Sequence, residues 1–163
     1  MKIALATDHA GFDQLRQLKE YLQAEGHECQ DFGPQSLDPA DDYPDFILPA
    51  AQAVASGECE AGIIMGGSGQ GEAMAANRVK GVRCTLFYSP AVARTAIDAE
   101  GRTSDDPYEI LRLSRRHNHA NVLSLSGRFL SLDEMKQAVQ IWLSTPYDEA
   151  ERHVRRVQKL DEA

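Results

Sequence analysis

The sequence predicts an α/β fold in which helices cover both faces of a parallel β-sheet. Short apolar runs of strand length alternate along the chain with longer segments whose apolar residues have helical spacing. Several of the short runs end directly in glycine or polar residues. Strands that alternate with helices are typical of parallel sheets, because each connecting helix packs on a face of the sheet. The length of 163 residues suits a single domain, residues 1–163, with a sizeable core.

Five segments are short and apolar enough to be strands, the second being the weakest: residues 2–7, 27–32, 61–65, 82–87 and 121–126. Helices are expected where apolar residues recur at helical spacing or strong helix formers cluster: residues 12–25, 44–56, 73–78, 89–97, 109–116, 132–143 and 147–160. Two polar segments that contain proline and several aspartates are expected to be surface loops: residues 33–43 and 100–108.

A glycine-rich loop, residues 66–72, joins the central apolar run to the helix that follows it. Its glycines let the backbone adopt positive φ and approach a ligand closely, and the N–H groups that begin a helix suit an anionic or hydroxylated ligand. Glu72 falls in the first helical turn, where its carboxylate could cap the helix or act as a general base. The loop lacks the Lys-Ser/Thr ending of a P-loop and the G-x-G-x-x-G spacing. By itself it is equally consistent with a tight strand-to-helix connection.

The composition excludes several classes of function. The net charge of −8 argues against broad binding to nucleic acids or anionic membranes. No apolar run approaches membrane-spanning length, and the N-terminus lacks a signal-peptide pattern. The three cysteines are an odd number without metal-ligand spacing and indicate reduced thiols. We therefore expect a cytoplasmic protein without a metal, a nucleic-acid partner or a membrane partner.

The last predicted helix is basic in an otherwise acidic chain. Arg152 and Arg156 are four residues apart and share a helix face. Charge pairs on a solvated face are the common explanation of such a run. The alternative is a two-pronged phosphate clamp, because guanidinium groups make bidentate contacts with phosphate.

Candidate ligand-binding residues follow three of the predicted strands. Residues 8–9, the glycine loop and residues 127–128 each come directly after a strand. Ligands of parallel sheets bind outside the carboxyl ends of the strands, so these segments are expected to meet at one edge. His117 and Asn118 precede a strand instead. They reach the same edge only if the preceding helix ends or bends there.

Segments spread over nearly the whole chain carry a family pattern: Asp8-His9-Ala10-Gly11, Asp42-Tyr43-Pro44, Gly67-Ser68-Gly69-Gln70-Gly71-Glu72, Ala75-Ala76-Asn77-Arg78, His117-Asn118-His119-Ala120-Asn121-Val122-Leu123, Gly127-Arg128, Thr145-Pro146 and Arg152-His153-Val154-Arg155-Arg156. This pattern resembles the type-B ribose-5-phosphate isomerases, a family that includes the galactose-6-phosphate isomerases.

The resemblance implies a flavodoxin-like three-layer fold with a five-stranded parallel sheet. It also implies a homodimer, possibly a tetramer, with shared active sites, in which the C-terminal helix (residues 146–163) protrudes to the partner's glycine loop. The implied reaction interconverts an aldose phosphate and a ketose phosphate without a cofactor. The substrates it implies most directly are ribose 5-phosphate and ribulose 5-phosphate.

The resemblance also implies the catalytic residues. Many family members have a cysteine base directly after the central strand, where this chain has Gly66. The chain is similar instead to the subgroup that carries a glutamate after the glycine loop, which makes Glu72 the candidate base. A positioned carboxylate can move a proton between C2 and C1 of the sugar, and the backbone N–H groups of residues 67–71 could stabilise the enediolate. His117 corresponds to the acid that helps to open the sugar ring.

The other residues that the resemblance implies would contact the substrate: Asp8, His9, Tyr43, Gly67, Ser68, Gly69, Gln70, Gly71, Asn118, Arg128, Arg152 and Arg156. The three arginines would hold the phosphate, with Arg152 and Arg156 coming from the other subunit. His153 would either assist at the phosphate or have a structural role.

Two other functions remain open: a six-carbon sugar-phosphate isomerase of the allose- or galactose-phosphate type, and a non-catalytic phosphosugar-binding protein on the same fold. A pure binding protein needs neither an acid nor a base, so Glu72 and His117 argue against it. The chain departs from the family in a longer segment between residues 89 and 117, with an expected insertion at residues 100–108. This departure bears on the identity of the sugar more than on the type of reaction.

Overall fold

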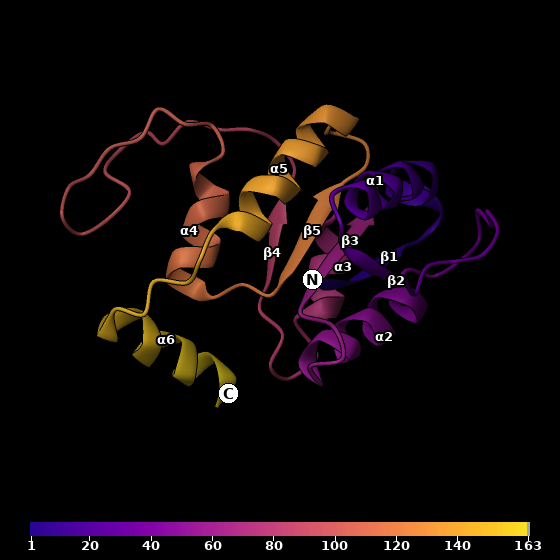
Figure 1. Cartoon of the computed structure of the whole chain (residues 1–163), viewed down its shortest axis with the longest axis horizontal. Helices are drawn as coiled ribbons and strands as arrows, with labels where there is room; N and C mark the ends of the chain where they lie inside the picture. Colours follow the sequence, from indigo (N-terminus) through magenta and orange to yellow (C-terminus); the bar gives the residue numbers. More distant parts are fainter. Residues whose placement is uncertain (163) are drawn as a thin grey trace.

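The computed structural model describes residues 1–162 and contains a five-stranded parallel sheet between two layers of helices (Figure 1). The strands are β1 (Lys2–Thr7), β2 (Glu28–Asp31), β3 (Ala61–Gly66), β4 (Cys84–Phe87) and β5 (Val122–Ser126). Their order across the sheet is β2-β1-β3-β5-β4, and every pair is parallel. The predicted three-layer α/β architecture is confirmed. The flavodoxin order 2-1-3-4-5 is modified at one edge, because β5 and not β4 lies beside β3.

The helices are η1 (His9–Gly11), α1 (Phe12–Ala24), α2 (Pro44–Ala55), α3 (Gln70–Ala76), α4 (Glu109–Asn118), α5 (Leu132–Ser144) and α6 (Glu151–Asp161). One hydrophobic cluster lies between the sheet and α1, α4 and α5, and a second lies between the sheet and α2 with α3. None of the helices described is both long and apolar enough to cross a membrane.

The central strand β3 is buried on both faces, as its burial pattern shows along its whole length. Side chains alternate between the two faces of a strand. Ile63 and Met65 therefore join the cluster with α1 and α5, whereas Ile64 joins the cluster with α2. The continuous apolar run that predicted this strand reflects burial on both sides.

The helix predicted at residues 89–97 does not form. Residues 88–108 leave the sheet after β4 as a long excursion without helix or strand (Figure 1). Val92, which would contribute to an apolar helix face, is 47% exposed. A helix this short is stable only when it buries a face against the rest of the protein, and residues 91–96 are all exposed.

The final helix begins at Glu151 and not near residue 147, because the preceding residues are held by α4. The ring of Tyr147 stacks on that of His119 at 4.3 Å between centroids. The backbone N–H of Asp148 donates to the carbonyl of Arg116 at 3.0 Å. These contacts keep the residues before Glu151 extended and delay the first helical turn.

Helix α6 contacts α4 of its own chain, and whether it also reaches a partner subunit stays a prediction. Residues His153 and Val157 of α6 are buried. Near its end, Asp161 accepts two hydrogen bonds from Nη1 of Arg83, at 2.8 and 3.0 Å. The position of α6 beside α4 is therefore defined within one chain.

Because β3 is buried on both faces, truncation of two consecutive residues of this strand should lower the free energy of unfolding by similar amounts. We expect Ile63→Ala and Ile64→Ala each to lower the free energy of unfolding by about 2–5 kcal/mol, because each leaves a cavity in a different core. Urea denaturation at fixed protein concentration measures this. Phe129→Ala is the control, since Phe129 is 67% exposed and should change stability by less than about 0.5 kcal/mol. A large loss for only one of the two isoleucines would contradict burial on both faces.

Candidate active site

The carboxyl ends of β1, β3 and β5 bring together the loops that were expected to meet there. The N–H of Gly127 donates to the carbonyl of Gly66 at 2.8 Å. A Cβ placed on Gly127 would lie 3.2 Å from the carbonyl oxygen of Ala10 and 3.3 Å from that of Gly66. The segments after these three strands are therefore in contact, and the predicted convergence of residues 8–9, the glycine loop and residues 127–128 is observed.

The glycine loop is tied to β5 through its carbonyl groups. Ser126 Oγ and the N–H of Arg128 donate to the carbonyl of Gly67 at 2.9 and 3.1 Å, and Ser124 Oγ donates to that of Gly69 at 2.7 Å. In a planar trans peptide the N–H points opposite to the C=O. The N–H groups of the residues that follow these carbonyls, Ser68 and Gln70, therefore point away from β5.

Glu72 lies in the first turn of α3, with its carboxyl group directed at the end of β3. The residue is only 5% exposed. Burial raises the pKa of the Glu72 carboxyl, and the nearby charge of Asp8 raises it further, against a lowering by a backbone hydrogen bond. A Cβ added to Gly66 would overlap the carboxyl group of Glu72. The Glu72 carboxyl therefore occupies the space that a side chain at position 66 would need.

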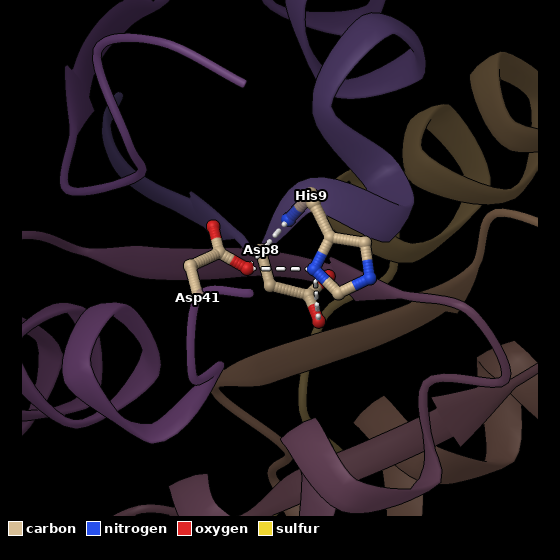
Figure 2. A group of neighbouring side chains, drawn as sticks. All are labelled: Asp8, His9 and Asp41. Carbon is tan, nitrogen blue, oxygen red and sulfur yellow. Dashed lines mark hydrogen bonds and ion pairs between the residues drawn. The ribbon is translucent and has the colours of Figure 1, made fainter. Parts of the chain in front are cut away.

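Asp8 and His9 follow β1 and lie beside a residue that the sequence did not single out, Asp41 (Figure 2). Asp8 caps η1 by accepting a hydrogen bond from the N–H of Ala10 at 2.9 Å. Asp41 Oδ1 lies 2.6 Å from Nδ1 of His9 and also accepts from the His9 backbone N–H at 3.2 Å. The hydrogen bond with Asp41 raises the pKa of His9. Asp41 thus orients the imidazole and favours its protonated form.

The same three side chains are close enough to bind one cation. One ligand atom each from Asp8, His9 and Asp41 can lie within 4.8 Å of the others. Nδ1 of His9, however, faces both carboxylates, at 2.6 Å from Asp41 and 3.8 Å from Asp8. This arrangement suits an Asp–His pair in which Nδ1 carries a proton, and a proton there leaves that nitrogen no lone pair for a metal. The expectation of a metal-free site stays a prediction.

Tyr43 and Arg128 cover the glycine loop. A Cβ added to Gly71 would lie 2.9 Å from Cζ of Tyr43, and one added to Gly67 would lie 3.2 Å from Cζ of Arg128. Both glycines therefore allow a close approach of a side chain to the backbone. The structure gathers these predicted residues at one edge of the sheet: Asp8, His9, Tyr43, Gly67, Ser68, Gly69, Gln70, Gly71, Glu72 and Arg128.

The remaining predicted residues form a second cluster, where the end of α4 meets the start of α6. The rings of His117 and His153 lie 4.3 Å apart between centroids. Nε of Arg152 donates to Nε2 of His153 at 3.0 Å, and Nδ1 of His153 lies 3.3 Å from the carbonyl of His117. His153 is 2% exposed. These contacts give His153 a structural part: it connects Arg152 to His117.

The surroundings of His117 disfavour the protonated form of its imidazole. Its burial lowers the pKa of the imidazole, and the neighbouring His153 and Arg152 lower it further, while Asp148 acts in the opposite direction. Asn118 and Arg156 are exposed.

The two clusters lie at opposite ends of the sheet within one chain. α4 continues to Asn118, and β5 begins only four residues later at Val122, so His117 lies near the amino end of β5. The glycine loop lies at its carboxyl end, beside Ser126. Five residues of strand separate these edges by roughly 15 Å. The helix ends one residue after His117, but it ends at the amino edge of the sheet, so the predicted acid and base do not meet in one chain.

Comparisons with known proteins show to which family the chain belongs. A family model described as "Ribose/Galactose Isomerase" matches residues 3–101 and 106–160. The unmatched residues 102–105 fall inside the insertion predicted at residues 100–108. A protein of Mycobacterium leprae named ribose-5-phosphate isomerase B is 37% identical over 99% of this chain and 89% of its own length.

Solved structures show the same fold. A ribose 5-phosphate isomerase of Thermotoga maritima has a TM-score of 0.84 and 37% identity, covering 99% of this chain and 98% of that chain. Ribose-5-phosphate isomerase B of Mycoplasma genitalium, solved with bound ribulose 5-phosphate, has a TM-score of 0.83 and 33% identity, covering 99% of this chain and 94% of that one. On the family match and these full-length similarities, the chain belongs to the ribose/galactose isomerase family.

Proposed function

We propose that this protein is an aldose–ketose isomerase that interconverts ribose 5-phosphate and ribulose 5-phosphate. The observation that carries the proposal is the buried carboxyl group of Glu72, which fills the space of the absent side chain at position 66. Many relatives are expected to hold a cysteine base at that position. The relatives named ribose-5-phosphate isomerase B, one of them solved with ribulose 5-phosphate, support the choice of substrate.

The proposed reaction needs one base and a set of hydrogen-bond donors. Glu72 takes the proton from C2 of the open-chain aldose and returns it to C1, while a proton is transferred from the hydroxyl on C2 to the oxygen on C1. Together these transfers move the carbonyl group to C2. The raised pKa of Glu72 makes its carboxylate a stronger base than an exposed glutamate. The N–H groups that point away from β5, including that of Ser68, stabilise the negative charge of the enediolate. Asp8 and His9 orient the sugar hydroxyl groups beside them.

We propose that a second subunit supplies the other half of the site. His117 and Arg152 both contact His153, but in their own chain they lie at the opposite end of the sheet from Glu72. A homodimer that places the α4–α6 end of one subunit against the glycine loop of the other would complete two equal sites. Asn118 and Arg156 would enter the same site. The phosphate held by the arginines would raise the pKa of His117 and allow it to donate a proton to the ring oxygen.

A six-carbon sugar phosphate is the second candidate substrate, because the insertion lies beside His117. Residues Asp98, Glu100 and Arg102 line a cavity with His117 and Arg152, so the segment contributes to the surroundings of the proposed acid. A cytoplasmic location fits the three free thiols of Cys29, Cys59 and Cys84.

Turnover on a panel of pentose and hexose phosphates tests the proposal. We expect the highest kcat/KM for ribose 5-phosphate, and undiminished activity after exhaustive chelation, because the donors of the enediolate are backbone N–H groups. Preference for a hexose phosphate would favour the second candidate. Binding without turnover of any sugar phosphate would indicate a non-catalytic protein, and loss of activity on chelation that one divalent ion restores would contradict the metal-free mechanism.

A side chain at position 66 would occupy the space of the Glu72 carboxyl group, so a cysteine at position 66 can be tested as a replacement for the proposed glutamate base. We expect Glu72→Gln and Gly66→Cys each to lower kcat by roughly 10²–10⁴-fold, the first by removing the base and the second by displacing it. The double variant Gly66→Cys with Glu72→Ala should recover part of the lost activity, because a thiol then occupies the vacated space. Its acid limb in the pH–rate profile should move to higher pH, since an ordinary thiol titrates near 8.5 and a carboxyl near 4.3.

Inorganic phosphate binding is the control for folding in this series and should be retained in all three variants. A double variant as inactive as Gly66→Cys alone would show that the two positions do not hold the base in the same place.

Subunit exchange tests the shared site. Homodimers of Glu72→Gln and of His117→Ala should both be nearly inactive, but a mixed dimer has one site with Glu72 from one chain and His117 from the other. Random mixing makes about half of the dimers mixed, so activity should approach roughly a quarter of wild type. The same recovery is expected when the Arg152→Ala, Arg156→Ala double variant replaces His117→Ala. Verified mixed dimers without recovered activity would place the complete site within one subunit.

A further inference from the structure

The segment between β4 and α4 places a carboxylate on one of the proposed phosphate-binding arginines. Glu100 accepts hydrogen bonds from both terminal nitrogens of Arg152: Nη1 to Oε1 at 2.6 Å and Nη2 to Oε2 at 3.2 Å. The third nitrogen, Nε, donates to His153 at 3.0 Å. The edge of the guanidinium group formed by Nη1 and Nη2 is therefore fully occupied by Glu100. The edge that includes Nε is occupied at Nε by His153. Phosphate uses the same two-pronged geometry, so it can bind Nη1 and Nη2 of Arg152 together only by displacing Glu100.

The backbone around Glu100 is fixed in a turn that presents this side chain. Asp98 Oδ1 accepts hydrogen bonds from the N–H groups of Glu100 and Arg102 at 3.1 and 2.9 Å. Asp98 Oδ2 accepts from Nε of Arg102 at 2.9 Å. The turn, residues 98–102, ends at the first of the residues that the family model leaves unmatched, 102–105.

The cavity beside the Glu100–Arg152 pair has a volume of about 350 Å³ and includes His117 in its wall. Its charged lining residues are three arginines and three carboxylates: Arg102, Arg116, Arg152, Asp98, Glu100 and Asp148. These charges cancel formally, so the cavity as it stands offers a phosphate dianion no net attraction. Removal of the Glu100 charge would leave the lining with one net positive charge.

Glu100 is the carboxylate on this cavity that can leave its arginine most easily. Its side chain is 60% exposed, whereas that of Asp98, which pairs with Arg102, is 11% exposed. An ion pair between exposed side chains is weak, because water and salt screen it. A ligand with higher charge than a carboxylate can therefore replace Glu100 on Arg152.

We propose that Glu100 competes with the substrate phosphate for Arg152 and thereby selects for dianionic phosphate esters. The inference rests on the proposed function, because Arg152 must be a phosphate ligand. A dianion binds the guanidinium more strongly than the resident carboxylate and displaces it. A singly charged or neutral sugar gains no advantage over Glu100 and is rejected, so the Glu100 carboxylate makes binding specific by repelling the wrong ligands.

Three variants test this inference in steady-state kinetics with ribose 5-phosphate and in calorimetric titration with inorganic phosphate. Glu100→Gln should lower both KM and the phosphate Kd by roughly two- to fivefold, the range expected for the loss of an exposed ion pair that opposes binding, and should leave kcat unchanged. Asp105→Asn is the matched control, since Asp105 is an exposed carboxylate of the same segment; it should change neither constant. Arg152→Ala should raise both.

The outcomes distinguish the competition by Glu100 from the proposed binding of phosphate by Arg152. If Arg152→Ala weakens phosphate binding but Glu100→Gln leaves it unchanged or weaker, the competition is wrong while the phosphate role of Arg152 stands. If Glu100→Gln and Asp105→Asn strengthened phosphate binding equally, the change in net charge of the protein would explain the effect, and the inference would also be overturned. If Arg152→Ala has no effect on phosphate binding, Arg152 is not a phosphate ligand and both proposals for this residue fail.

Discussion

A parallel sheet keeps the beginnings of its strands at one edge and the ends at the other, because every connection must return across a face. Side chains that follow a strand and side chains that precede a strand are therefore separated by the length of the strand. In this chain Glu72 follows β3, while His117 precedes β5 and is joined there by Arg152 from α6. No local rearrangement of a loop can bring these groups together within one chain. A two-fold assembly joins opposite ends of the sheet without changing the fold, and this constraint makes the oligomer part of the proposed chemistry.

The properties of Glu72 follow from where the loop places it. A carboxylate in the first turn of a helix is ordinarily stabilised by the unpaired N–H groups there, and this lowers its pKa. Burial and the charge of Asp8 act in the opposite direction and prevail. The two effects come from different parts of the sequence: the short loop after β3 buries the carboxyl group, and the end of β1 supplies the second carboxylate. The Glu72 carboxylate thus becomes more basic at the expense of electrostatic stability.

The sequence predicted those parts of the molecule that depend on local pattern. The apolar runs at β1, β3 and β5 are buried strands, and the residues that follow them meet because the ends of parallel strands share an edge. The helix expected at residues 89–97 is absent because helical propensity does not report whether a surface is available to bury an apolar face. The late start of α6 depends on the stacking of Tyr147 on His119, a contact between distant positions.

In the candidate site, too, contacts between residues that are distant in the sequence could not be predicted from local pattern. Asp41 lies in a loop with several aspartates, and only the path of that loop shows which of them faces His9. The role of His153 depends on the packing of α6 on α4, which no periodicity in either helix reveals.

The overlap of a side chain at position 66 with the Glu72 carboxyl group also restricts how such a site could change over evolutionary time. A chain that gains a cysteine at position 66 while it keeps Glu72 must displace one of the two groups. Under the proposed role of Glu72, a chain that loses Glu72 first has no base beside the loop. The glutamate and cysteine forms of the site are therefore alternatives without a fully functional single-step intermediate. A lineage that carries one form would tend to keep it, and the identity of the base would mark descent as well as chemistry.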